Sequence, residues 1–185
     1  ASRLGLEVRD LGERQNVGTA SVPTAMGATR RAASRVGDMA PFAPDRMYVV
    51  PVSANEKLLG HQIDGVLGTD FLMRYVMEFD YSAGTVTAHD ALTSAYSGPE
   101  APLAVNLAGN RLLAPSTLTL PDGEQVNAQL LVDTGSNTRL ILTAPFVRTH
   151  RLIQRFPSAR MTASVGINGL TTSPLITARS LRLGA

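Results

Sequence analysis

The sequence predicts an all-β protein with a few short helices. It is rich in turn-forming Gly, Pro, Ser and Thr and poor in aromatic and charged residues. Its apolar residues come in short runs bounded by Gly, Pro, Asp and Asn, which is typical of strands separated by turns. The length of 185 residues suits one or two small domains, and a 44% hydrophobic content is enough to bury a core.

The first half of the chain is predicted to contain strands, one hairpin and a short helix beginning near Asp70. The predicted strands are residues 19–28 with a turn at Met26-Gly27, 47–52, and a hairpin of 76–81 and 85–88 with a turn at 82–84. The polar, Gly- and Pro-containing residues 91–102 then form the best candidate linker.

The second half is predicted to continue in strands, with a short helix over residues 145–152. The predicted strands are residues 103–107, 116–120 with a turn at Pro121-Asp122-Gly123, 130–132, 140–142, and segments of 161–183 with a turn at 166–169.

Asp133 is the strongest candidate for chemistry. The apolar run Leu130-Leu131-Val132 leads into it, Thr134, Gly135 and Ser136 then form a turn, and apolar residues resume at 140–142. We therefore expect a buried strand that presents Asp133 at its end. A buried carboxylate without a partner costs several kcal/mol, and acid/base catalysts use carboxylates in such settings. An Asp-Gly turn in an ordinary hairpin is the structural alternative.

The Asp133-Thr134-Gly135-Ser136 segment resembles the catalytic loop of the aspartic peptidases, both pepsin-like and retropepsin-like. Residues 63–72 are similar to a second element of that family, Asp-Gly-Ile-Leu-Gly-x-Asp-Phe-Leu. In this family two loops meet, and their carboxylates share one proton and activate a water molecule. The resemblance implies acid-protease β-barrel lobes of a two-lobed, bacterial-type enzyme.

The resemblance assigns roles to the four loop residues. Asp133 would be one of the two catalytic carboxylates. The Thr134 hydroxyl would bond across to the partner loop, and Gly135 would let the backbone approach the water. Ser136 would hydrogen-bond the catalytic carboxylate, although a simple turn serine is the alternative.

The second element is expected to be structural. Asp64, Gly65, Val66, Leu67 and Gly68 match the segment that crosses beneath the catalytic loop, and Asp70 matches the cap of the following helix. Neither Asp64 nor Asp70 is therefore expected to be catalytic.

Two turns are candidates for the tip of a substrate-covering flap. One is Gly166, Ile167, Asn168 and Gly169, and the other is residues 25–28. Both lack the tyrosine of the family's flap, so a plain hairpin turn is the alternative at each.

An internal repeat predicts the domain organisation. Thr19-Ala20-Ser21-Val22 recurs as Thr162-Ala163-Ser164-Val165. We expect residues 1–90 to be the later part of lobe one, 91–102 the linker and 103–185 the earlier part of lobe two. Residues 1–6 match the short helix and turn after a catalytic loop. A first Asp-Thr-Gly is thus expected upstream of Ala1, and the end of lobe two after Ala185.

The predicted function is an aspartic endopeptidase acting on a polypeptide substrate. Its second carboxylate would come from the missing N-terminal segment or, in a retroviral-style homodimer, from a second Asp133. A non-catalytic binding or structural module on the same fold is the other alternative.

Other function classes have little support in the sequence. The net charge of +2 has no basic block to favour nucleic acid, and no apolar run is long enough to span a membrane. The three scattered histidines and the absence of cysteine argue against a metal, and no cofactor is expected. The compartment is unknown, with a periplasmic or secreted location slightly favoured.

Overall fold

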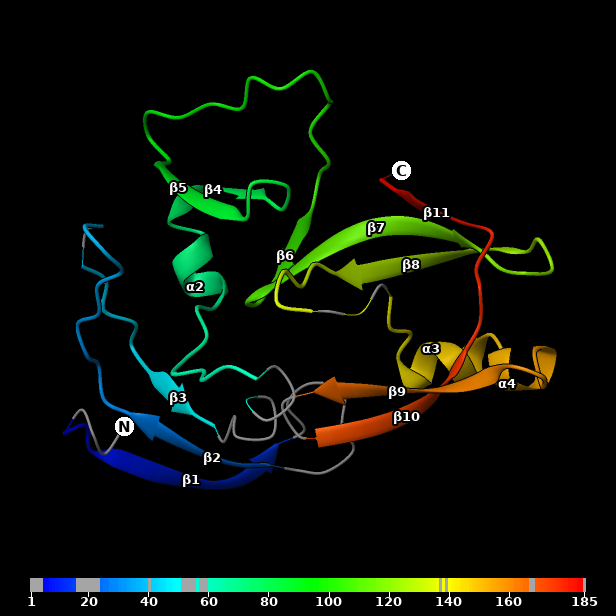
Figure 1. Cartoon of the computed structure of the whole chain (residues 1–185), viewed down its shortest axis with the longest axis horizontal. Coiled ribbons are helices and arrows are strands. Elements are labelled where there is room, and N and C mark those ends of the chain that lie inside the picture. Colours follow the sequence, from blue (N-terminus) through cyan, green and yellow to red (C-terminus); the bar gives the residue numbers. More distant parts are fainter. Residues whose placement is uncertain are drawn as a thin grey trace. The chain divides into compact units, whose positions relative to one another are not determined.

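The computed structural model describes residues 5–15, 24–39, 41–50, 56, 60–136, 138, 140–166 and 169–184. Their regular structure is mostly strand, with a few short helices, which confirms the all-β prediction (Figure 1). The chain forms two compact units, Ala1–Val66 with Thr162–Ser173, and Leu67–Met161 with Pro174–Ala185. They divide the chain at positions other than residues 91–102, which contain no strand or helix. The two-lobe assignment stays a prediction.

The first unit contains a three-stranded antiparallel sheet with β2 at its centre. Its strands are β1 (Val8–Gln15), β2 (Thr24–Thr29) and β3 (Met47–Val49), in the order β1-β2-β3. The strand expected at 47–52 is thus confirmed over β3. The short helix and turn expected over residues 1–6 fall mostly outside the described chain: Gly5 lies in a turn, and β1 begins at Val8. Residues 1–4 lie outside the described chain.

The turn predicted at Met26-Gly27 is wrong, since β2 passes straight through it. Gly27 pairs with Asp10 on one side and Val49 on the other. A Cβ atom at Gly27 would lie 2.6 Å from Val8 Cγ1, so glycine serves close packing here and not chain reversal. Residues 25–28 lie in a central strand and cannot be the tip of a flap.

The second unit begins with the predicted helix and hairpin. Helix α2 (Thr69–Leu72) precedes β4 (Tyr75–Asp80) and β5 (Thr85–Asp90), which pair antiparallel along their full lengths. Both predictions are confirmed. Asp70 is not the helix cap as expected: it lies in the first turn, and Gly68 is the N-cap, without a side-chain cap hydrogen bond.

A four-stranded antiparallel sheet, built around β7, forms the centre of this unit (Figure 1). Its strands are β6 (Asn106–Ala108), β7 (Arg111–Thr119), β8 (Gln125–Leu131) and β11 (Ser180–Leu183). The predicted β7–β8 hairpin is confirmed, with Gly123 at φ 96° in its turn. Leu113 pairs with both β6 and β8, and Thr117 pairs with both β8 and β11. Strand β8 therefore lies along one edge of β7, and β6 and β11 lie along the opposite edge.

Two short helices cover one face of this sheet. They are α3 (Ala144–Thr149) and α4 (Leu152–Arg155), so the predicted helix over residues 145–152 is confirmed in position but broken at Arg151, whose φ is 52°. The buried residues are Leu118, Leu120, Val126 and Leu152, with Leu142, Phe146, Val147, Phe156, Ile176 and Ala178 packed against them.

Two expectations around the Asp133 loop are wrong. Residues 140–142 do not form a strand; Leu142 packs on the core instead. The apolar run that leads to Asp133 is not fully buried, because Leu131 is 54% and Val132 45% exposed. The apolar pattern resembles a strand covered on both faces, but β8 is covered on the face of Val126 and exposed on the face of Leu131.

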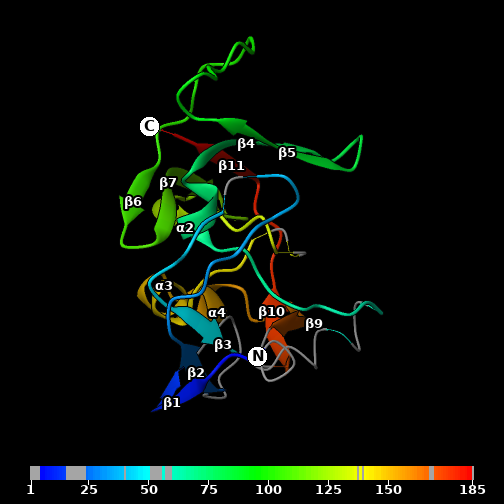
Figure 2. The same ribbon diagram turned by 90° about the vertical axis from the view of Figure 1, so that its left-hand side faces the viewer.

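The remaining strands form a hairpin, seen in Figure 2. Strands β9 (Arg160–Gly166) and β10 (Gly169–Leu175) pair with each other, as the sequence predicts for this region. Ile167 and Asn168 lie outside the described residues, so the flap assigned to residues 166–169 stays a prediction.

Candidate functional site

Asp133 follows β8 and is held in place by the β7–β8 ladder. Leu131 pairs with Leu113, and the Val132 N–H donates to Leu112 O at 2.9 Å, which extends the ladder to the residue before Asp133. The prediction that a strand end presents Asp133 is therefore confirmed, although the side chain is exposed and not buried.

The carboxylate of Asp133 closes its own turn. The Gly135 N–H donates to Asp133 Oδ1 at 3.0 Å, and the Ser136 N–H donates to the backbone oxygen of Asp133 at 3.3 Å. A Cβ atom at Gly135 would make an ordinary 3.4 Å contact with Oδ1. This turn therefore does not require glycine, and the predicted role of Gly135 beside a water molecule stays a prediction.

Ser136 does not make the predicted contact with the carboxylate. Its hydroxyl lies 2.8 Å from Thr138 Oγ1 and accepts the Thr138 N–H at 3.2 Å. A short polar turn satisfies its own hydroxyls locally, which is the alternative that the sequence left open. Thr134 is exposed, and its bond to a partner loop stays a prediction.

The geometry of this turn is common in the molecule. A backbone N–H two residues on also donates to the carboxylates of Asp10, Asp80, Asp90 and Asp122, at 2.9, 2.9, 2.7 and 3.2 Å. Local hydrogen bonding alone therefore does not distinguish a catalytic aspartate from a turn aspartate.

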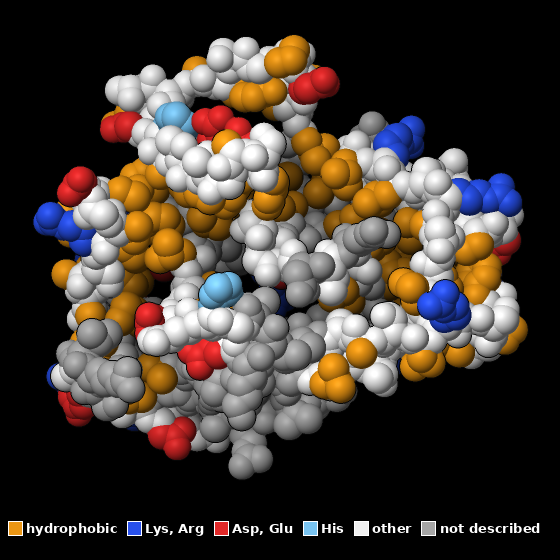
Figure 3. Space-filling view, viewed as in Figure 1, with side chains coloured by type: hydrophobic (Ala, Val, Ile, Leu, Met, Phe, Trp, Pro, Cys, Tyr) orange, Lys and Arg blue, Asp and Glu red, His pale blue; other side chains and the backbone are white. Residues whose placement is uncertain are grey.

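The surroundings of Asp133 are more distinctive than its turn. Exposed aliphatic side chains flank the loop on both sides in sequence: Leu131 and Val132 before it, Leu140 (37% exposed) and Ile141 (44%) after it. Figure 3 shows many such hydrophobic side chains at the surface. An exposed carboxylate with aliphatic neighbours is accessible to water and to an apolar partner.

The second motif is also at the surface. Val66 is 73% and Leu67 48% exposed, and Asp64 accepts a 2.7 Å hydrogen bond from Gln62 Nε2. Gly65 is exposed as well, and Gly68 begins α2. The crossing role predicted for Asp64 to Gly68 stays a prediction.

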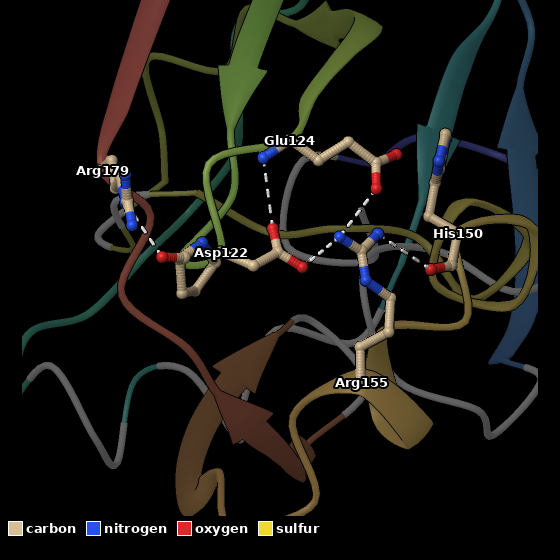
Figure 4. Close-up of polar contacts among 6 residues, drawn as sticks. Asp122, Glu124, His150, Arg155 and Arg179 are labelled. Atoms are coloured by element: carbon tan, nitrogen blue, oxygen red, sulfur yellow. Dashed lines mark hydrogen bonds and ion pairs between the residues drawn. The ribbon is translucent and has the colours of Figure 1, made fainter.

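A polar cluster that the sequence did not reveal lies before the start of β8 (Figure 4). Arg155 Nη2 of α4 contacts Asp122 Oδ2 and lies 2.7 Å from Glu124 Oε2, and Arg179 Nε donates to Pro121 O at 2.9 Å. The turn residues and the helix arginine are far apart in sequence, so no local pattern pairs them. The cluster joins the β7–β8 turn to α4 and to the segment before β11.

The Arg155 hydrogen bond lowers the pKa of Asp122, and the same bond raises the pKa of Arg155. An aspartate with a lowered folded-state pKa stabilises the fold above its unfolded pKa of about 4, and this stabilisation is lost as the pH falls through the folded pKa. We therefore call this cluster a clamp: it holds the β7–β8 turn to α4, and its contribution to the stability of the fold depends on pH.

Removing the arginine tests this clamp. We expect Arg155→Met to lower the unfolding free energy at about pH 6, and the difference from the native protein to shrink toward about pH 3 as Asp122 is protonated. Denaturant unfolding at several pH values measures this. Arg151→Met, which removes a nearby positive charge, is the control; an equal pH dependence in both variants would contradict the clamp.

Among the described residues, no three or more His, Asp or Glu side chains are grouped so as to hold a metal ion. None of the helices in the described part of the chain has the length and apolar character needed to cross a membrane.

Comparison of the chain with protein-family models, curated proteins and solved structures finds no match. Any function must therefore be argued from the residues and their placement.

Proposed function

We propose that the chain is part of an aspartic endopeptidase in which Asp133 is one of two catalytic carboxylates. The observation that carries this proposal is the pair of motifs, Asp133-Thr134-Gly135-Ser136 and residues 63–72, in one chain of mostly β structure. The exposed position of Asp133 after β8 supports it, because a carboxylate there is accessible to a water molecule and to a polypeptide.

The chemistry requires two carboxylates that share a proton. The ionised one takes a proton from the water as it attacks the scissile carbonyl carbon, and the protonated one donates its proton to the carbonyl oxygen. The carboxyl that took the water proton then gives it to the nitrogen as the C–N bond breaks, and a hydroxyl of the tetrahedral intermediate returns its proton to the other carboxylate. Asp133 supplies one carboxylate, and no cofactor is needed.

The second carboxylate is the open part of the proposal. The 185 residues contain one Asp-Thr-Gly, and Asp64 and Asp70 belong by resemblance to a structural element. The partner acid would come from a preceding segment of a longer chain or from a second Asp133 in a homodimer. A non-catalytic module on the same fold remains the alternative, and it needs no second acid.

Activity and mass measured on one sample separate these possibilities. We expect residues 1–185 to be inactive on a mixed peptide library across about pH 3 to 7, the range in which a carboxylate dyad works, in any assembly that does not bring two Asp133 carboxylates together. A longer chain that restores an upstream Asp-Thr-Gly would then cleave peptides.

Other outcomes distinguish the alternatives. Cleavage by a dimer, blocked by a transition-state analogue such as pepstatin, would favour a dimer that pairs two Asp133 carboxylates over one that keeps them apart. A longer chain that binds peptides without cleaving them would favour the non-catalytic module. Cleavage by a verified monomer of residues 1–185 would contradict the need for a second acid.

A further inference from the structure

The outer edge of β8 carries backbone groups that pair with no other strand of the described chain. The Leu120 N–H donates to Glu124 O at 2.8 Å, and the Val132 N–H donates to Leu112 O at 2.9 Å. Because hydrogen-bonded pairs alternate along an antiparallel ladder, the even-numbered residues of β8 bond to β7. The N–H and C=O groups of the odd-numbered residues therefore point away from β7. These residues are Gln125, Asn127, Gln129 and Leu131, and all four are exposed.

This edge lacks the features that normally protect an edge strand. Natural edges are blunted by charged residues, proline, bulges or short length. Among the described strands, β1 carries Arg9 and a bulge after Asp10, β10 contains Pro174, and β11 is short and contains Arg182. Strand β8 has seven residues without charge, proline or bulge. It is therefore a good template for another strand.

We propose that a second copy of this chain occupies this edge, with the two β8 strands antiparallel about a twofold axis at Ala128. This register places Gln125 opposite Leu131 of the second copy and Asn127 opposite Gln129 of the second copy. All four outward-facing residues of each strand are then in hydrogen-bonded pairs, each of which exchanges two bonds. Both sheets become one continuous antiparallel sheet.

The charges and side-chain sizes of the edge fit this self-pairing. At the axis Ala128 lies opposite its own copy in a closely spaced pair, where small side chains fit well. Glu124 and Asp133, the acidic residues on either side of the strand, lie opposite Val132 and Gly123 of the second copy. No like charges meet, so the second copy is electrostatically acceptable at this edge.

Shifting the register by two residues makes the pairing less complete. With the axis at Asn127, Leu131 faces the turn residue Gly123 of the second copy. With the axis at Gln129, Gln125 faces Asp133 of the second copy, beyond the end of β8. The register centred on Ala128 is the one that uses the whole strand.

This dimer would not form a catalytic dyad. The two Asp133 residues would lie ten strand positions apart, on the order of 30 Å at the usual rise per residue. It is therefore a different assembly from a homodimer that pairs two Asp133 carboxylates, and its existence does not depend on the proposed peptidase function.

Introduced cysteines test the register, because the chain has no cysteine of its own. Directly opposed residues in a hydrogen-bonded pair have Cα atoms about 5.5 Å apart, which suits a disulfide. We expect the double variant Gln125→Cys/Leu131→Cys to form covalent dimers under mild oxidation, and either single variant to form none. Crosslinking of Asn127→Cys or Gln129→Cys alone would indicate a shifted register and overturn the proposed one.

Charge substitutions test the interface itself. Sedimentation should give the native chain twice its mass of 19.6 kDa. Asn127→Lys/Gln129→Lys and Asn127→Glu/Gln129→Glu place like charges opposite each other, so each variant alone should be monomeric. Their equimolar mixture should dimerise, because Lys then faces Glu.

The control is Thr87→Lys/Val86→Lys, which adds the same charge to the exposed strand β5 and should leave the dimer intact. Circular dichroism checks that each variant is folded. A native chain that is monomeric at every concentration, or charge variants that remain dimeric alone, would overturn the proposal.

Discussion

Replacing Asp133 by asparagine should abolish peptide cleavage by the complete enzyme while leaving its fold intact. The asparagine Oδ1 can still accept the Gly135 N–H, which is 3.0 Å from Asp133 Oδ1, so the turn is retained. The amide cannot ionise or carry the shared proton. Acid–base groups contribute about 10² to 10⁴-fold to rate, and we expect kcat to fall by at least about 10³-fold.

The control for this variant is Asp90→Asn. Asp90 is the last residue of β5, much as Asp133 follows shortly after β8; it is exposed and accepts a backbone N–H two residues on, from Leu92 at 2.7 Å. Its substitution reproduces the chemical change in a matched turn and should leave kcat unchanged. Thermal melting of both variants checks the fold. An active, folded Asp133→Asn protein would show that the catalytic carboxylates lie elsewhere.

Replacing Leu120 by alanine should destabilise the second unit more than any surface change. Leu120 is completely buried and packs with Leu118, Val126 and Leu152 at the centre of the core. Removing a buried leucine side chain costs about 2 to 5 kcal/mol, including the cavity left behind. Since domains are stable by only about 5 to 15 kcal/mol, this loss is large.

The matched control is Leu92→Ala. Leu92 is 95% exposed, so this substitution removes the same side-chain atoms at the surface. Denaturant unfolding followed by circular dichroism should show a lower midpoint for Leu120→Ala and no change for Leu92→Ala. Equal midpoints for the two variants would contradict the position of Leu120 in the core.

The predictions that succeeded depend on local chemistry. The β4–β5 hairpin is set by Asp80, whose carboxylate accepts the N–H groups of Ser82 and Ala83, each at 2.9 Å. The β7–β8 hairpin turns at Gly123, whose φ of 96° favours glycine. Turn residues act within a few positions of the chain, so the sequence alone was enough to predict both hairpins and the strand that leads to Asp133.

The predictions that failed concern partners distant in sequence. Gly27 is typical of a turn, but it lies in a central strand. Glycine is needed there because Val8 packs against the space where a Cβ atom would be. The apolar run before Asp133 is typical of a buried strand, but Leu131 is exposed because it lies on the face of β8 opposite to the buried Val126. The pairing of Arg155 with Asp122 likewise follows from packing and not from spacing.

The sequence by itself thus determined the all-β class, the two hairpins around their turns, and the position of Asp133 after a strand. Only the tertiary structure decided which faces of the apolar strands are covered by other segments. It also decided which glycine lies in a packed strand and which lies in a turn, and which charged side chains form ion pairs. The physical reason is that turn geometry depends on neighbouring residues, whereas burial depends on which distant segment supplies the other side of the contact.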